Sequence, residues 1–104
     1  MIFIETTMFT RRAKELMDDA AYITLQKVLV LNPSVGDLIE GTGGIRKVRV
    51  AAKGHGKRGG ARVIYYHFVS ESQIALLMIY PKNEQQDLTA DERKALKAVI
   101  EYWR

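Results

Sequence analysis

The sequence contains no cysteine, which excludes disulfide bonds and thiolate metal sites and is compatible with a reducing compartment. It has two histidines, His55 and His67, with no Asp/Glu pair near them, so a metal site and a Ser-His-Asp hydrolase lack support. No apolar run approaches the roughly 18 residues that span a bilayer. The first residues, MIFIETTMFTRR, become polar too soon for a signal peptide. We therefore expect a soluble, cytoplasmic protein with no membrane partner.

Acidic residues are missing from one long stretch, since none occurs from Gly41 to Ser70. That stretch carries a formal charge of +7, and because the whole chain carries +4, the remainder carries −3. Seven of the eight glycines also lie within residues 41–62. A local patch of one sign indicates a polyanionic partner. The alternative, a solvated surface loop, fits less well because solvated surfaces usually mix both signs.

Hydrophobic periodicity predicts the element order β-α-α-β-β-β-α. The expected strands are 1–5, 45–51, 61–69 and 73–82, and the expected helices run from Thr6 or Thr7 to Met17, from Asp18 or Asp19 to Asn32, and onward from Thr89. The last three strands should form an antiparallel meander, and the first two helices should pack as a hairpin. The predicted fold class is α+β, as one domain over residues 1–104: an antiparallel sheet with two N-terminal helices and a C-terminal helix.

Four local patterns give further expectations. Residues 73–82 are almost wholly apolar, which predicts a strand buried on both faces near the sheet centre. Thr89 and Glu92 form a capping box. The segment MIFIE should be a sheet edge that can accept a strand from a partner. The last helix carries an apolar stripe in which the tryptophan should be a core anchor: Leu96, Val99, Ile100 and Trp103.

The basic stretch does not match the common nucleotide motifs. Residues 54–59 fit G-x-G-x-x-G, but a strand follows them where a dinucleotide site needs a helix. A Walker A motif fails because no Gly-Lys is followed by Ser or Thr. Phosphate binding or phosphate chemistry remains. Lys47 and Arg49 alternate on one strand face, and Arg62 enters the neighbouring strand, so their cations should converge on one side of the sheet.

Tyrosines occur in the adjoining strands at Tyr65, Tyr66 and Tyr80. Some of them could stack on bases, as aromatic side chains do in single-stranded RNA sites. The alternative is packing within the sheet, which we expect for at least two of the three.

Three segments together match one known family. They are NPSVGDLIEGTGGIRKVRVA, KGHGKRGGARVIYY and IYPKNEQQDLTADERKAL, and the match covers essentially the whole chain. In these segments and in its element order, the chain resembles the RelE/ParE superfamily of bacterial toxin–antitoxin toxins, and most of all its HigB-type branch. The resemblance implies a RelE-like fold.

The same resemblance implies a function. RelE-type toxins are mRNA interferases, which enter the ribosomal A site and cut the exposed codon through attack of a ribose 2′-hydroxyl on the adjacent phosphate. They need no metal and no other cofactor. The implied partners are the ribosome, mRNA and a cognate HigA-type antitoxin with a helix-turn-helix part. Operator DNA would be reached only through that antitoxin.

Catalytic residues follow from the resemblance by position. Lys47 and Arg49 match two RelE lysines that flank the scissile phosphate, and Arg62 matches an arginine at the start of the third strand. Lys82 keeps the lysine of a Gly-Lys-Arg turn. Thr89 lies near the position of the RelE tyrosine that helps to deprotonate the 2′-hydroxyl, but it has the features of a helix cap.

The general base is therefore open, and four residues are candidates: His55, Tyr80, Lys82 and Glu84. With Tyr80 included, the predicted catalytic set is Arg62, Lys47, Arg49, Lys82 and Tyr80. Other basic residues of the same stretch are predicted to bind RNA, including ribosomal RNA: Arg46, Lys53, His55, Lys57 and Arg58.

Two other functions compete with this interpretation. ParE-type members of the same fold inhibit DNA gyrase and tend to lack a basic RNA-cleaving cluster. A catalytically inert RNA-binding or ribosome-binding domain would use the same positive charge without cutting. The concentration of cations around Arg62 favours the ribonuclease.

Overall fold

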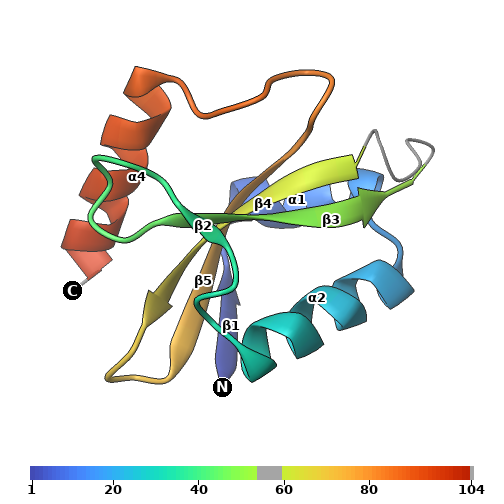
Figure 1. The fold of residues 1–104 in the computed structure, drawn as a ribbon, viewed down its shortest axis with the longest axis horizontal. Helices are drawn as coiled ribbons and strands as arrows, with labels where there is room; N and C mark the ends of the chain where they lie inside the picture. The colour runs from blue at the N-terminus through green and yellow to red at the C-terminus, as the bar shows by residue number, and fades with distance from the viewer. Residues whose placement is uncertain (54–59, 104) are drawn as a thin grey trace.

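The computed structural model describes residues 1–53 and 60–103, and within them the chain forms five strands and three helices (Figure 1). In chain order these are β1 Ile2–Glu5, α1 Thr7–Leu16, α2 Asp19–Leu31, β2 Asp37–Leu38, β3 Arg46–Ala52, β4 Gly60–Phe68, β5 Gln73–Pro81 and α4 Ala90–Trp103. The predicted α+β class is confirmed. The one addition is β2, whose two residues are too few to leave a hydrophobic period in the sequence.

The strands form a single sheet in the order β1-β5-β4-β3-β2. Strands β3, β4 and β5 form the predicted antiparallel meander. Strand β1 pairs in parallel with β5, so the sheet is antiparallel except at this edge. Strand β2 pairs only with the first two residues of β3. Strand β5 is buried as predicted, but β4 is the central strand.

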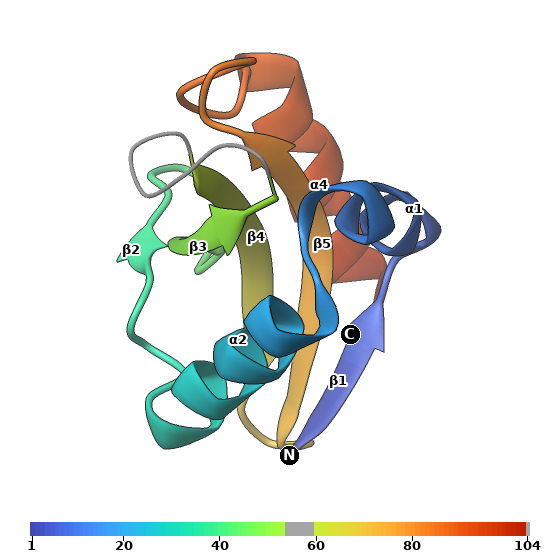
Figure 2. The same ribbon diagram turned by 90° about the vertical axis from the view of Figure 1, so that its right-hand side faces the viewer.

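Helices cover both faces of the sheet, with α1 and α2 on one side and α4 on the other (Figure 2). The first face packs residues such as Phe9, Leu25 and Tyr65 into one apolar cluster. The second face packs Ile64 and Leu96 into another. No helix in these described segments is long and apolar enough to cross a membrane.

The helix starts agree with the sequence signals. Thr6 caps α1, and Asp18 caps α2. At the start of α4, the Glu92 backbone N–H donates to the Thr89 hydroxyl at 3.1 Å, and the Thr89 N–H donates to the Glu92 carboxylate at 2.9 Å. This reciprocal pair is the predicted capping box, and it fixes where the segment between β5 and α4 ends.

The predicted helical hairpin is wrong. Helix α1 packs mainly on β5 and α2 on β3, and the helices meet through Phe9 and Tyr22, whose ring centroids lie 6.3 Å apart. The connection between α1 and α2 is short, but the sheet offers each helix a larger apolar surface than the other helix does.

The predicted core role of Trp103 is also wrong, because its side chain is 43% exposed. Leu96 and Ile100 face the core, whereas Val99 lies outside it. In the last turn of α4 the Trp103 ring packs edge to face with Phe68, with centroids 5.9 Å apart. The helical stripe therefore turns away from the sheet before it reaches the tryptophan.

Candidate active site

Strands β3 and β4 approach each other closely where β4 begins. A Cβ atom on Gly60 would lie 2.7 Å from the Val50 carbonyl oxygen, so only glycine fits this position without a shift of the backbone. The register then pairs Arg49 with Arg62. Cross-strand partners share a face of the sheet, and Lys47 shares it with Arg49 by strand alternation. The predicted convergence of these three cations on one side is confirmed.

These side chains border a hollow of about 360 Å³, which we call the cationic hollow. Its lining comes from β2, β3, β4 and the segment after β5: Asp37, Lys47, Arg49, Arg62, Lys82, Gln86 and Asp87. Lys82 is held there because its backbone N–H donates to the Gly60 carbonyl oxygen at 3.0 Å. Four of the five predicted catalytic residues thus surround one space.

Within the part of the chain that the structure describes, the guanidinium of Arg62 has an unsatisfied hydrogen-bond donor. Its Nη1 atom is buried and has no hydrogen-bond partner among the described residues. Burying a guanidinium donor without a partner is costly, and such donors are nearly always satisfied in folded proteins. An anion in the hollow would supply the missing acceptor.

Asp87 forms an ion pair with Lys47 at the rim of the hollow. The hydrogen bond from Lys47 and its charge lower the pKa of the Asp87 carboxyl, with smaller contributions from Arg93 and Arg62. Asp87 is therefore ionised at neutral pH and holds the Lys47 ammonium in place. Sequence analysis missed it, together with Asp37 and Gln86, because only the path of the chain after β5 brings it to β3.

Tyr80 belongs to the core under the hollow and not to its lining. Its side chain is 2% exposed, and its hydroxyl donates to the Gln86 carbonyl oxygen at 3.3 Å. Burial raises the pKa of Tyr80, with a further contribution from Asp87. The structure thus places Tyr80 as a support for the segment that carries Gln86.

The other two tyrosines are buried as well. The Tyr65 hydroxyl donates to the Pro33 carbonyl oxygen at 2.7 Å and accepts from the Gly36 N–H at 3.0 Å. Tyr66 packs in the cluster under α4. All three tyrosines therefore pack within the sheet, as the alternative predicted, and none lines the cationic hollow, where a bound RNA base would stack.

The remaining predicted residues lie elsewhere. Glu84 pairs with Arg12 of α1, away from the hollow. Arg46 points to the opposite face, where it donates to the Gly36 carbonyl oxygen at 2.7 Å. Lys53 donates to the Lys14 carbonyl oxygen at 3.3 Å. His55, Lys57 and Arg58 fall outside the described residues. In the described segments no three His, Cys, Asp or Glu side chains gather to hold a metal ion.

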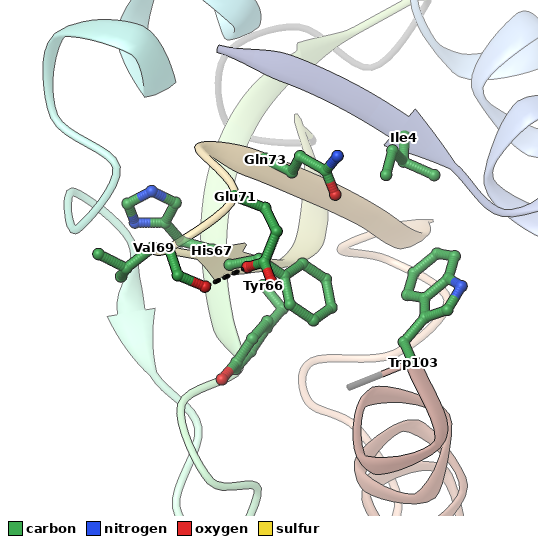
Figure 3. A pocket seen from close by; sticks show the side chains of 9 residues that line it. Ile4, Tyr66, His67, Val69, Glu71, Gln73 and Trp103 are labelled. Carbon is green, nitrogen blue, oxygen red and sulfur yellow. Dashed lines mark hydrogen bonds between the residues drawn. The ribbon is translucent and has the colours of Figure 1, made fainter.

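A second pocket, of about 650 Å³, lies at the other end of β4 (Figure 3). Tyr66 and His67 of β4, Ile4 of β1 and Trp103 of α4 stand around it. We call it the Trp103 pocket. Tyr66 and Phe68 pack edge to face beside it, with ring centroids 4.8 Å apart. It lacks the gathered cations of the first hollow.

Comparison with known proteins identifies the family. Residues 2–104 match the family described as the RelE toxin of the RelE/RelB toxin–antitoxin system. Among solved structures, the free E. coli toxin RelE with two arginines replaced by alanine is similar, with a TM-score of 0.61, 12% identity and 95% of each chain covered. The archaeal RelE–RelB complex from Pyrococcus horikoshii OT3 gives a TM-score of 0.56 and 17% identity over 81% of this chain and 97% of that chain.

The two structural matches show the shared fold, and the family match over nearly the whole chain goes further. The family match shows that the partner of this chain is a cognate antitoxin and that the chain has the endoribonuclease activity of the family. The chain belongs to the RelE toxin family, and its function is that of a toxin–antitoxin toxin acting as a ribosome-dependent mRNA interferase.

Proposed function

We propose that the cationic hollow is the place where this toxin binds and cuts mRNA in the ribosomal A site. One observation carries the proposal: Arg62, whose buried Nη1 has no partner among the described residues, lines one hollow together with Lys47, Arg49 and Lys82. Guanidinium groups pair bidentately with phosphate, and lysines add point charges around it. The hollow therefore has the chemistry of a phosphodiester site.

The reaction proceeds by internal transfer at phosphorus. The ribose 2′-oxygen forms a bond to the adjacent phosphorus while the bond from phosphorus to the 5′-oxygen of the next nucleotide breaks. The products are a 2′,3′-cyclic phosphate and a 5′-hydroxyl, so the proton lost by the 2′-hydroxyl is balanced by the one gained at the 5′-oxygen. Charge grows on the phosphorane oxygens in between, where fixed cations stabilise it most.

The cations divide this work by position. Arg62 donates to the phosphorane, because its guanidinium lines the hollow next to its cross-strand partner Arg49 and has hydrogen-bonding capacity that the described residues leave unused. Lys47 and Arg49 hold the backbone on either side. A phosphate would take Lys47 from Asp87, since both compete for the same ammonium. These charges fill the role that a metal ion plays in other nucleases, so the proposed cleavage is metal-independent.

Lys82 is our proposal for the general base. Of the four candidates it alone among the described residues lines the hollow, whereas Tyr80 is buried and Glu84 is paired with Arg12. A lysine accepts a proton only as the neutral amine. Lys82→Arg keeps the positive charge but does not give up a proton to act as a base, so it should cut mRNA much more slowly than the wild type.

The decisive experiment maps new mRNA 5′ ends after induction in bacteria, on translated and untranslated copies of one transcript. Ends should appear within reading frames of the translated copy only. Arg62→Ala should lower cleavage by about 100- to 1,000-fold, the usual effect of removing one group that stabilises transition-state charge. Lys27→Ala, on the exposed side of α2, is the control and should cut normally.

Several outcomes would overturn the proposal. Intact mRNA with DNA-damage signalling would favour gyrase inhibition, and salt-sensitive RNA binding without new ends would favour an inert RNA-binding domain. Slow cleavage of an mRNA that carries sulfur at the cut phosphate, restored by Mn²⁺ or Cd²⁺, would contradict metal independence. A melting curve for Arg62→Ala that matches the wild type ensures that lost activity reflects chemistry.

The partner assignment completes the proposal. We propose a HigB-type toxin whose antitoxin is of the HigA type and carries a helix-turn-helix, with operator DNA reached by the toxin only through that antitoxin. Lys53 and the cations at 57 and 58 would add contacts to ribosomal RNA. A gel-shift assay should then show operator binding by the purified complex and none by the free toxin. Operator binding by the toxin alone would contradict this assignment.

A further inference from the structure

Strand β3 is paired along its whole inner side by β4, but its outer side is mostly open. Strand β2 covers only Arg46 and Lys47. The Ile39 N–H donates to the Ile45 carbonyl oxygen at 2.8 Å, and alternation along an antiparallel strand then directs the backbone groups of Arg49 and Ala51 to this same outer side. Both residues are exposed, and within the described residues neither has a backbone partner there.

The open edge has defined ends. The next outward N–H, that of Lys53, donates to the Leu16 carbonyl oxygen at 2.7 Å, so the last turn of α1 closes the edge. Between the pairing of Lys47 with β2 and this bond lie the N–H and carbonyl groups of Arg49 and Ala51. They offer a short ladder for one extended segment from another chain.

Helix α2 runs beside this open edge, as Figure 1 shows. Between α2 and β3 lies a groove of about 430 Å³, which we call the α2–β3 groove. Its apolar lining comes from both elements: Ala21, Leu25, Val28, Val48, Val50 and Ala52. A side chain on the groove side of an added strand would thus enter an apolar space.

Exposed large apolar side chains gather on α2 and on the segment that follows it to β2. They are Ile23, Val28, Val30, Leu31, Val35 and Leu38. Such a concentration on the elements that border a groove marks an interaction surface. The face of β3 that borders the cationic hollow is charged and not apolar. Arg49 lies between the two surfaces, since it lines both the groove and the hollow.

We propose that an extended segment of the cognate antitoxin pairs with the outer edge of β3 at residues 49–51. Its alternate side chains would be apolar toward the α2–β3 groove and acidic toward Arg49 and Lys47. The antitoxin is the occupant that fits, since it is the partner of this toxin family and since acidic residues complement the cations beside the edge. A strand bound here would also cover Arg49 and Lys47 and so block the hollow; this inhibitory effect rests on the proposed function, whereas the docking rests on the edge and groove alone.

The edge formed by β1 is the competing site for strand addition, as predicted from the sequence. It lies at the far side of the sheet from β3. A strand added to Ile2–Glu5 would leave Lys47 and Arg49 uncovered, so it would not by itself block the hollow. Binding at that edge is therefore a distinguishable outcome.

The test measures affinity of purified toxin variants for the purified cognate antitoxin, without RNA. Ala51→Pro removes the outward N–H and leaves the bonds from β3 to β4, so the sheet should persist. Affinity should fall at least about tenfold, because a ladder bond is lost and the ring crowds the added strand. Ala51→Val keeps the N–H and should bind like the wild type. Free Ala51→Pro toxin should still cut mRNA.

A second pair of variants tests the groove. Val28→Asp places a charge in the α2–β3 groove and should also weaken binding about tenfold or more. Val99→Asp makes the same change on the exposed side of α4, which covers the other face of the sheet, and should have a much smaller effect. Equal losses from the two variants would contradict the groove as the docking site.

Hydrogen exchange on wild-type toxin decides the matter even if a variant folds poorly. In the complex the amides of Arg49 and Ala51 should exchange far more slowly than in free toxin. Unchanged exchange there, with protection at Ile2–Glu5 or around the Trp103 pocket, would overturn the proposal. Because the affinity and hydrogen-exchange measurements do not use cleavage, failure of the proposed ribonuclease site would leave them intact as a test of docking.

Discussion

The two ends of β4 place the same buried strand in two different surroundings. At its start, Arg62 meets the cations of β3 and Lys82 around the cationic hollow. At its other end, Tyr66 and Phe68 meet Trp103 around an apolar pocket. The central strand of a sheet is a rigid support, so side chains at its ends are held in place by the packing between them. The difference suggests that one end performs chemistry and the other contributes stability.

The largest expected effect comes from reversing a charge at the cationic end. Arg49→Glu should reduce mRNA cleavage by about 100-fold or more, because it replaces a cation beside the phosphate with a repelling carboxylate. Lys27→Glu makes the same change of charge on the exposed side of α2 and should leave cleavage nearly unchanged. Primer extension on one translated transcript gives both rates. Equal losses would mean that net charge matters and that the hollow does not.

The buried tyrosines between the two ends should make the fold sensitive to alkali. Burial raises the pKa of both Tyr65 and Tyr80. The unfolded chain ionises near pH 10 while the folded chain keeps these protons. Stability is therefore complete below that pH and is lost as the pH rises toward the raised pKa values of the folded state, at no more than about 1.4 kcal/mol per pH unit for each tyrosine. Urea unfolding from pH 9 to 11 measures this slope.

Two phenylalanine variants sharpen the alkaline test. Tyr65→Phe should flatten the slope by its own share, although it also removes hydrogen bonds to Pro33 and Gly36 and so lowers stability at neutral pH. Tyr102→Phe should leave the curve unchanged, because that side chain is 91% exposed. The account fails if stability stays flat through pH 11.

The smallest effect is expected at the apolar end. Trp103→Ala should destabilise the fold by about 1 kcal/mol, since the ring is partly exposed and makes one edge contact with Phe68. Cleavage by the folded variant should equal that of the wild type. A loss of cleavage without a loss of stability would show that the two ends of β4 are not separate in function.

Sequence periodicity predicted the features that depend only on residues close together in the chain. Strand alternation placed Lys47 and Arg49 on one face, and the Thr89–Glu92 spacing gave the helix cap. It did not reveal Asp87, because the contact with Lys47 depends on how the segment after β5 folds back over the sheet. It also misjudged Trp103, since a helical stripe does not indicate how far the helix extends along the surface that it covers.

Arg49 borders both the cationic hollow and the α2–β3 groove. Under the two proposals, one guanidinium serves the substrate and also faces the inhibitor. A mutation of Arg49 that prevented antitoxin binding would also inactivate the toxin, because the same side chain is needed for cleavage. An active toxin that no longer binds its antitoxin would therefore not arise from a change at this residue.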